Sequence, residues 1–575
     1  MVELGENLTF VKWIRENEII MIKKIILWSW MLATGSVAIA QQKSREAWVS
    51  PFDFPLLLSA NFGELRPNHF HNGIDIKTQG VTGKPVHCVA EGYISRVAVQ
   101  HGGYGQVVYV AHPDGHTSVY GHVERFSDGV QKRVREYQYA NETFVCSLTF
   151  TPDEFPVRQG EIIAWSGNEG ASAGPHLHLE MRDTETGTYI DPMPFYRRML
   201  EDHKAPVASL VGIYPLENEG VVEGSSRRKL VAVSGLKQPV TAWGKIYTGI
   251  SAKDYMDGTS NFYGVHSVKL FVDDREVFHS LTDSVRADEN RMINAFTDYD
   301  ELMRSRRLIM RSYRAPGNRL QLLQTDSCRG VVTIDEERDY RFRYELEDNF
   351  GNRSSYRFTV RGKRQEIPQQ EHPGKTLLRW DRTNVIQQPG MQLVIPQGML
   401  YENAWLDKKV SGDSARTSFD YVLDAGHTPL HGFCELSIGV RHRTVADSTK
   451  YYILQRWGKG HTPIGGKMEN GWVKARVRTF GTFAVGVDTV PPRITPLNKG
   501  NWRGNFSRIR LKISDAESGI ASYKVHIDGK FVLFGLKKGA LVIQDPRRIS
   551  RSGVHRMEVW VTDCCGNEQY EKFQF

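Results

Sequence analysis

The sequence predicts a mostly β protein, in which an antiparallel-sheet domain is followed by β-sandwich modules of Ig-like type. Between residues 45 and 200, short runs of β-forming residues alternate with tight-turn sequences such as Gly102 to Gly105 and Pro113-Asp114-Gly115. From about residue 205, alternating apolar and polar patterns recur between polar turns. Helical periodicity is scarce, and Asp298 to Arg311 is the best helix candidate. Close strands joined by tight turns favour antiparallel sheets.

Within the first domain we expect four neighbouring strands, at residues 86–89, 93–99, 106–111 and 117–120. Residues 124–158 interrupt this pattern with a charged segment at 131–136 and a strand-like run at 143–150. We interpret this stretch as an insertion that forms an extra hairpin or flap. The strand pattern returns at 160–165.

A weak internal repeat links two later parts of the chain. Gly264 to Asp273 resembles Gly519 to Asp528, because each alternates with period two and runs into an acidic turn. Each is followed by an Asp-x-x-Gly-Asn sequence, at 348–352 and at 563–567. Such a turn would close the last hairpin of a sandwich, so we predict two similar β-sandwiches.

A chain of 575 residues is too long for one core, and three to five domains are expected. Pro491-Pro492 marks the entry to the last module, since neither proline suits a central strand. The predicted division is an over-extended start plus signal peptide at 1–40, the antiparallel-sheet domain at 45–200 with its insertion at 124–158, a sandwich at 205–362, a linker at 363–375, a β-rich domain at 376–488 and a second sandwich at 489–575.

The N-terminal stretch has the three-part plan of a secretory signal peptide. Met21 to Lys24 is basic, Ile25 to Ala33 is apolar, and Ala38 to Ala40 offers a cleavage pattern before Gln41. The apolar part is too short for a comfortable membrane span, although a buried apolar helix is an alternative. We therefore expect Met21 to be the true start and the protein to be exported to the periplasm, the cell envelope or the medium. No transmembrane anchor beyond the signal peptide is expected.

Charge and cysteine content limit the possible partners. The net charge of +8 is spread along the chain, and no nucleic-acid motif accompanies it, so no nucleic-acid partner is expected. The six cysteines lack C-x-x-C spacing and are too few for a disulfide scaffold in a chain of this length, so they are expected to be mostly buried thiols.

Candidate metal ligands lie in three short pieces, His71-Asn72-Gly73-Ile74-Asp75, Tyr120-Gly121-His122 and Gly174 to Glu180. Two imidazoles and a carboxylate suit a catalytic zinc, which takes three protein ligands and leaves a fourth position for water. In an extended or looped segment, His71 and Asp75 lie on the same side, and the glycine between them allows tight backbone geometry. His69 is a competing ligand on the same face.

The His-x-His pair is the sharper signal. If Leu177 to Glu180 is a strand, His176 and His178 point to the same face; the alternative is a pair of ordinary surface or core histidines. His122 by itself is weak evidence for a catalytic site, because a lone histidine is more often structural than catalytic. Glu180 could orient a ligand, although a surface glutamate at a strand end is equally expected.

Taken together, the three pieces resemble the lysostaphin/LytM-type zinc metallopeptidases, which cut peptide cross-links of bacterial peptidoglycan. The resemblance runs from about Phe62 to Pro192, and the insertion at 124–158 departs from the family pattern. The matching pieces are Gly63-Glu64-Leu65-Arg66, His71 to Asp75, Gly83-Lys84-Pro85-Val86, Ala90-Glu91-Gly92, Gly102 to Gly105, Tyr120-Gly121-His122 and Gly174 to Glu180.

The resemblance implies roles for five residues. His71, Asp75 and His178 would bind zinc, and His122 and His176 would flank the catalytic water. One of this second pair would take the water's proton and pass it to the leaving amine, while the other would hydrogen-bond the oxyanion; the sequence leaves open which does which.

The expected function is that of an exported zinc metalloendopeptidase, with peptidoglycan peptides as its substrates. One alternative is a non-enzymatic envelope scaffold that regulates wall hydrolases, because a flap at 124–158 could occlude the cleft. Another is an endopeptidase that acts on a Gly-rich extracellular protein.

Overall fold

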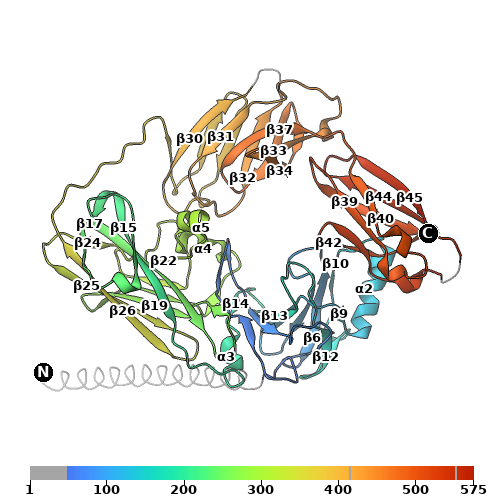
Figure 1. Cartoon of the computed structure of the whole chain (residues 1–575), viewed down its shortest axis with the longest axis horizontal. Coiled ribbons are helices and arrows are strands. Elements are labelled where there is room, and N and C mark those ends of the chain that lie inside the picture. The colour runs from blue at the N-terminus through green and yellow to red at the C-terminus, as the bar shows by residue number, and fades with distance from the viewer. Residues whose placement is uncertain (1–47, 413–415, 551–552) are drawn as a thin grey trace, which may run out of the picture.

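The computed structural model describes residues 48–412, 416–550 and 553–575, so the predicted leader at 1–40 lies outside the described residues. The protein is mostly β, as predicted, and it has four large hydrophobic cores. Figure 1 shows four β-rich units in a closed arrangement, in which the C-terminal unit returns to the side of the first. We call them the N-terminal unit, the first repeat unit, the middle unit and the second repeat unit.

The N-terminal unit is built on a central antiparallel sheet, whose strand order places motifs from distant parts of the chain side by side. In spatial order its strands are β1 (Leu58–Ala60), β4 (Ile74–Lys77), β13 (His176–Asp183), β8 (His116–Gly121), β7 (Gln106–Ala111), β6 (Gly92–Val99) and β10 (Cys146–Thr149). Short pairings add β11 (Pro156–Val157) beside β6, and β14 (Tyr189–Ile190) between β13 and β21 (Ser284–Val285).

A smaller sheet packs against this one. It consists of β5 (Pro85–His87), β12 (Ile162–Trp165) and β9 (Arg125–Phe126), and β2 (Leu65–Arg66) and β3 (His69–Phe70) form a separate hairpin. Val86 and Ile163 of the smaller sheet share one apolar core with Val97 and Leu177 of the central sheet. Burial of these β-branched and leucine side chains is the main stabilising contribution to the unit.

The prediction that residues 124–158 form an extra hairpin or flap is wrong. Residues Asp128–Ala140 form α2, the longest helix among the described residues. Its buried positions are Val130, Val134 and Gln138, which lie four residues apart on one face, while the charged residues cover the other face. The strand-like run at 143–150 becomes β10, which pairs with β6 at the sheet edge rather than extending as a flap.

The first repeat unit contains long antiparallel strands, and β17 joins β26 in parallel. In spatial order the strands are β16 (Lys229–Ala232), β15 (Val207–Val222), β17 (Val240–Tyr255), β26 (Arg353–Gly362), β25 (Asp339–Glu347), β19 (Ser267–Val272), β20 (Arg275–Leu281) and β23 (Leu323–Thr325), with β18 (Phe262–Tyr263), β22 (Met310–Arg311) and β24 (Val332–Ile334) beside β17. The short helices α3 (Met193–Tyr196) and α4 (Ile293–Phe296) precede and interrupt it.

The helix predicted at Asp298 to Arg311 is shorter in the structure. It is α5 (Tyr299–Ser305), capped by the Asp298 side chain, which accepts a hydrogen bond from the Glu301 amide. Arg306 adopts a left-handed conformation that ends the helix, and β22 occupies the last predicted helical residues.

The internal repeat has a clear structural counterpart. In the first repeat unit β19 pairs with β25, which turns back into β26; in the second, β40 (Ile520–Ile527) pairs with β44 (Arg556–Asp563), which turns back into β45 (Glu568–Gln574). The Asp-x-x-Gly-Asn sequences at 348–352 and 563–567 close these two hairpins, as predicted.

The middle and second repeat units each have two main sheets around one core. The middle unit contains β27 (Thr376–Leu378), β30 (Ala404–Ser411), β31 (Asp420–Asp424), β37 (Gly481–Val487), β33 (Tyr451–Trp457) and β34 (Gly460–Gly465) in one sheet, and β28 (Asn384–Gln388), β29 (Met391–Ile395), β32 (Cys434–Gly439), β36 (Trp472–Val477) and β35 (Lys467–Glu469) in the other. The second repeat unit pairs β38 (Arg493–Leu497), β39 (Arg510–Ser514), β43 (Ala540–Ile543) and β42 (Phe534–Lys537) with a sheet of β41 (Lys530–Phe531), β40, β44 and β45.

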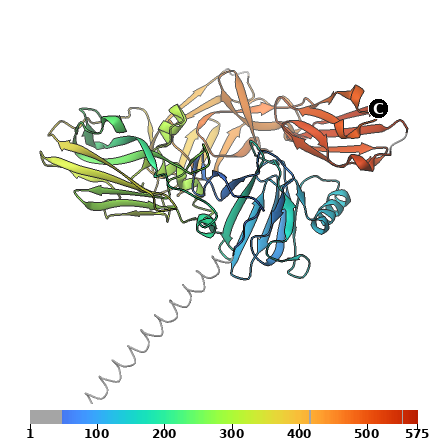
Figure 2. The same cartoon turned by 60° about the horizontal axis from the view of Figure 1, so that its bottom comes forward.

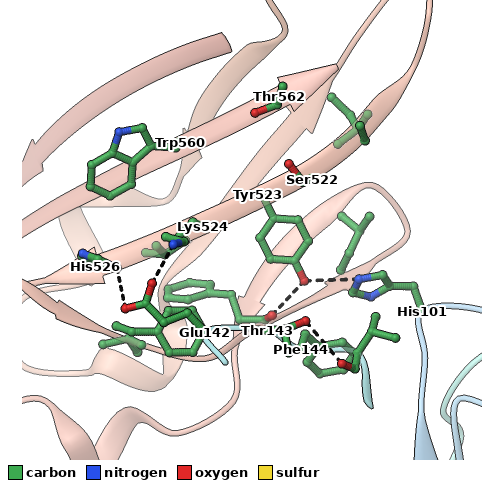
Figure 3. Close-up of a pocket in the computed structure, with 18 of the residues that line it drawn as sticks. His101, Glu142, Thr143, Phe144, Ser522, Tyr523, Lys524, His526, Trp560 and Thr562 are labelled. Atoms are coloured by element: carbon green, nitrogen blue, oxygen red, sulfur yellow. Dashed lines mark hydrogen bonds and ion pairs between the residues drawn. The ribbon is translucent and has the colours of Figure 1, made fainter. Parts of the chain in front are cut away.

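The second repeat unit closes the arrangement by contacting the N-terminal unit beside α2 (Figures 1 and 2). Lys524 pairs with Glu142 at 2.6 Å, and the Tyr523 hydroxyl lies 3.5 Å from His101 (Figure 3). The residues that make these contacts line a pocket of about 710 Å³ between the two units.

Of the six cysteines, four are buried and two are exposed, and all are free thiols. None of the helices in the described ranges is long and apolar enough to cross a membrane.

Candidate metal centre

Three adjacent strands bring the three motifs to one place. On β13, His178 lies opposite Asp75 of β4 and, on its other side, opposite Gly121 of β8, which directly precedes His122. Gly73 permits the close approach of the loop before β4, because a Cβ atom at this position would lie 2.3 Å from the Leu179 carbonyl oxygen. Residues about a hundred positions apart are thus brought into contact by sheet register.

His71, Asp75 and His178 converge on one point and are all buried. The Nε2 atom of His71 lies 3.0 Å from Asp75 Oδ1 and 3.1 Å from His178 Nδ1, and the last two atoms are 2.8 Å apart. Tetrahedral zinc with bonds of about 2.0–2.2 Å holds its ligand atoms roughly 3.3–3.6 Å apart. The three side chains therefore fit zinc after an outward shift of a few tenths of an ångström.

Both ligand imidazoles are oriented through their other nitrogen. His71 Nδ1 lies 2.7 Å from the Asn61 carbonyl oxygen, and His178 Nε2 lies 2.9 Å from Glu180 Oε1. Only His71 Nε2 and His178 Nδ1 are then left for a metal, an arrangement that fixes the tautomer of a ligating histidine. Glu180 is fully buried, so the interpretation of this residue as a surface glutamate is wrong.

The carboxylates are held in place as well. Arg66 donates to Asp75 Oδ2 at 3.1 Å, which leaves Oδ1 for the metal. Glu180 accepts hydrogen bonds from the Tyr104 hydroxyl and from the Arg182 guanidinium. Arg66, Tyr104 and Arg182 are not among the predicted site residues, although the first two lie in matching motifs. Arg182 is two positions after Glu180 on a strand, and that spacing could have indicated a shared face.

The electrostatics of the cluster favour one bound proton when no metal is present. Burial lowers the pKa of His71 to about 4. Burial alone would also lower the pKa of His178, but hydrogen bonds to Asp75 and Glu180 outweigh it and raise that pKa to about 9. Burial would raise the pKa of Asp75, yet the adjoining imidazoles hold it well below its usual range. The carboxylates of Asp75 and Glu180 thus favour a cation, either a proton or a metal ion, where the three side chains meet.

The remaining two histidines, His122 and His176, lie side by side next to the cluster, with ring centroids 4.7 Å apart. His122 Nδ1 is 2.7 Å from the Glu169 carbonyl oxygen, and His176 Nδ1 is 2.8 Å from the Gly174 carbonyl oxygen. Because a carbonyl can only accept, Nδ1 of each imidazole carries the hydrogen and Nε2 of a neutral ring has a free lone pair. Burial, with the charges of neighbouring histidines, lowers the pKa of His122 to about 4, so its ring is neutral at pH 7.

His122 also has an unusual backbone conformation. Its φ angle is 62°, in the left-handed region that non-glycine residues rarely adopt. Its amide donates to the Tyr104 carbonyl oxygen at 3.0 Å, which helps to fix this geometry. His69, in contrast, is exposed on β3 and lies outside the group of potential ligands.

An open cleft of about 870 Å³ leads to the cluster. Asp75, His176 and Arg66 line one part of it, and Asn261 and Phe262 of the first repeat unit line another. None of the described lining residues comes from the insertion at 124–158, which packs instead toward the second repeat unit. The insertion therefore does not cover this cleft in the structure.

Comparisons with known proteins identify two segments. Residues 69–140 match the model of a family described as Peptidase family M23, and residues 375–488 match that of a Zu5-like domain. An uncharacterized metalloprotease from Haemophilus influenzae is 34% identical over 131 residues, which is 23% of this chain and 21% of that protein. The DD-carboxypeptidase/endopeptidase Mpg of Neisseria meningitidis is 33% identical over 112 residues, which is 20% of each chain.

Among solved structures, the catalytic domain of the prophage-encoded M23 protein EnpA from Enterococcus faecalis is 26% identical; the match covers 24% of this chain and 92% of that one, with a TM-score of 0.19. The chain spans about a fifth of the length of the two curated relatives described above. The family match at residues 69–140 includes two of the three motifs, His71 to Asp75 and Tyr120-Gly121-His122. The chain therefore contains a domain of peptidase family M23, to which the lysostaphin/LytM-type enzymes belong.

Proposed function

We propose that this protein is an exported zinc metalloendopeptidase that hydrolyses peptide cross-links of bacterial peptidoglycan. One observation carries the proposal: His71 Nε2, Asp75 Oδ1 and His178 Nδ1 converge within 3.1 Å of one another at an open cleft, beside two further imidazoles. The similarity to a DD-carboxypeptidase/endopeptidase supports a peptide substrate. The predicted signal peptide supports export.

The donor set suits zinc and its usual catalytic use. When bound, zinc supplies the acidity that makes water a nucleophile at neutral pH and polarises the scissile carbonyl. His71, Asp75 and His178 would hold it, with Asn61, Glu180 and Arg66 fixing their orientation.

His122 and His176 handle the proton and the developing charge. A neutral imidazole with a free Nε2 can accept a proton from water, and the resulting imidazolium can donate it to the leaving amine. The second imidazole of the pair, once protonated, can donate to the oxyanion of the tetrahedral intermediate. The carbonyl oxygens of Glu169 and Gly174 hold both rings through Nδ1, so that neither role requires reorientation of a side chain.

The proposal is tested by peptide release from purified peptidoglycan, followed by mass spectrometry. We expect release by the wild type, loss of release after chelation, and recovery when zinc is restored. His178→Ala should retain no zinc and release nothing, while His69→Ala, at an exposed position in the same segment, should behave as the wild type. If the zinc-loaded wild type releases no peptide from the wall but cleaves Gly-rich protein substrates, the substrate assignment is wrong; if it cleaves neither, the protein is a scaffold.

A further inference from the structure

Three buried aspartates meet where the N-terminal unit joins the first repeat unit. Asp202 lies in the connecting segment, Asp254 near the end of β17, and Asp348 in the turn between β25 and β26. These residues are 6%, 3% and 2% exposed, and one carboxylate oxygen from each lies within 4.8 Å of the others. This cluster is separate from the histidine site and has no part in the proposed mechanism.

Two of the buried oxygens have no partner. Asp202 Oδ2 and Asp254 Oδ1 make no hydrogen bond, and within the described part of the chain no lysine or arginine forms an ion pair with any of the three carboxyl groups. A buried charge normally requires an ion pair, hydrogen bonds or a metal. Burial, reinforced by the neighbouring carboxylates, raises the pKa of Asp202 to about 6 and that of Asp254 to about 8. A cation bound among the three carboxyl groups would supply the balancing charge that no lysine or arginine in the described ranges supplies.

The third carboxylate is fixed by the hairpin turn. Asp348 Oδ1 accepts hydrogen bonds from the amides of Phe350 and Asn352. The Asn352 side chain donates to Asp348 Oδ2 at 2.8 Å and to the Asp202 carbonyl oxygen at 3.1 Å. The turn therefore holds the connecting segment and its aspartate in place before any ligand binds.

The second repeat unit provides an internal comparison. Asp488, Asp515 and Asp563 form an equivalent cluster, and Asn567 donates to the Asp488 carbonyl oxygen at 3.2 Å, as Asn352 does to Asp202. There, however, the Ser518 hydroxyl and amide both donate to Asp488 Oδ2.

Asp515 in that cluster is satisfied as well. Its Oδ1 accepts hydrogen bonds from the amides of Glu517 and Gly519. The first repeat unit has Tyr263 where the second has Ser518, directly before the repeated glycine, and the Tyr263 hydroxyl donates to the Leu58 carbonyl oxygen instead. The donors that satisfy Asp488 Oδ2 and Asp515 Oδ1 therefore have no counterpart at Asp202 Oδ2 and Asp254 Oδ1.

We propose that Asp202, Asp254 and Asp348 bind a Ca²⁺ ion at the junction between the two units. Three carboxylates and no nitrogen or sulfur donor form a ligand set for a hard cation. Ca²⁺ bonds to oxygen at about 2.3–2.6 Å, so oxygens up to roughly 5 Å apart can share one ion, and its irregular geometry accepts carboxylates on three separate segments. Mg²⁺ requires shorter bonds and a stricter octahedron, and it fits this set less well.

The position of the site suggests what the ion does. Next to Asp348, Asn349 donates to Asp191 at 2.6 Å and the Phe350 carbonyl oxygen accepts from Arg197 at 2.7 Å, both across the junction. Asp254 begins the segment that leads to Phe262 in the cleft wall. Bound Ca²⁺ would join these segments and hold that wall against the N-terminal unit.

The test is a calorimetric titration of the full-length, chelator-treated protein with Ca²⁺ alone. We expect one site in the wild type, at least tenfold weaker binding in Asp254→Asn, and unchanged binding in Asp515→Asn, the matched change in the second cluster. His178→Ala should also leave Ca²⁺ binding unchanged, so failure of the proposed peptidase function would not affect this result. No binding at millimolar Ca²⁺, or loss of binding in Asp515→Asn but not in Asp254→Asn, would overturn the proposal.

Thermal unfolding separates a binding role from a purely structural one. Without Ca²⁺, Asp254→Asn should melt no lower than the wild type, because it removes a carboxyl group from a repulsive cluster. With Ca²⁺ the wild type should gain several degrees and the variant nothing. A variant that melts lower than the wild type without Ca²⁺, and by the same margin with it, would contradict the proposal, as would stabilisation by Mg²⁺ in place of Ca²⁺.

Discussion

His178 is held between two carboxylates, Asp75 on Nδ1 and Glu180 on Nε2, and its raised pKa of about 9 reflects both. A metal at Nδ1 must displace the proton there. Since the pKa is raised, the competing proton is present throughout pH 6–8 and becomes easier to remove as the pH rises. We therefore expect zinc affinity to increase about tenfold per pH unit in this range.

Competition with a zinc-binding dye at several pH values measures this dependence. In Glu180→Gln, which removes one of the two carboxylates that stabilise the imidazolium, the slope should flatten toward pH 8. An affinity that is independent of pH in the wild type would show that His178 does not carry the displaced proton.

His122 provides a second prediction at the residue scale. Its side chain is not one of the three converging ligands, so His122→Ala should retain zinc. Loss of a proton-handling group typically lowers the rate of turnover by about 10²–10⁴-fold. Zinc content by atomic absorption and peptide release, measured on the same preparation, check both parts. Full hydrolysis by the zinc-loaded variant would contradict the assigned role.

Among the secondary-structure elements, the strand pairing at the site depends on one glycine. Gly73→Ala would place Cβ 2.3 Å from the Leu179 carbonyl oxygen, so the loop that carries His71 must move away from β13. We expect a loss of about 1–3 kcal/mol in the free energy of unfolding, as for other overpacked sites, together with weaker zinc binding. Chemical denaturation and a zinc titration measure the two effects.

Gly102→Ala is the matched control for this change, because a Cβ atom at Gly102 would meet nothing within 4 Å. It should leave both quantities close to those of the wild type. Equal effects of the two substitutions would show that the contact with β13 is not the cause.

How far the sequence predicts these elements depends on how local their signals are. Strands with tight turns, the two Asp-x-x-Gly-Asn hairpins and the His-x-His strand are local patterns, and the structure has them where they are expected. The sequence does not predict helix α2, because the charges at 131–136 obscure the spacing of Val130, Val134 and Gln138. The contacts of Asn61 and Arg66 with the metal ligands were not predicted, because they depend on how segments cross in space.

At the scale of the whole molecule, the closed arrangement of the four units could not be read from the sequence, because residues hundreds of positions apart form it. Lys524 pairs with Glu142, and Lys537 pairs with Glu169, both at 2.6 Å. Glu169 also supplies the carbonyl oxygen that holds His122. The second repeat unit is thus linked, through one loop, to a residue of the candidate site.

Reversing both charges should open the arrangement. Lys524→Glu with Lys537→Glu replaces two partly exposed ion pairs by like-charge contacts, each change being worth about 0.5–1 kcal/mol. A total of about 1–2 kcal/mol would shift the ratio of closed to open molecules roughly 5- to 30-fold. Small-angle X-ray scattering at low salt should show a larger radius of gyration, and peptide release should fall as the Glu169 loop loses its support.

Adding Glu142→Lys and Glu169→Lys to that variant restores opposite charges in both pairs and should recover the compact form, whereas loss of fold could not be rescued in this way. Lys474→Glu, which breaks an ion pair with Glu469 inside the middle unit, is the control and should leave the radius of gyration unchanged. If the double reversal leaves the radius of gyration at the wild-type value, the apolar and aromatic contacts of the interface, such as Tyr139 with Phe531, hold the units together without the ion pairs.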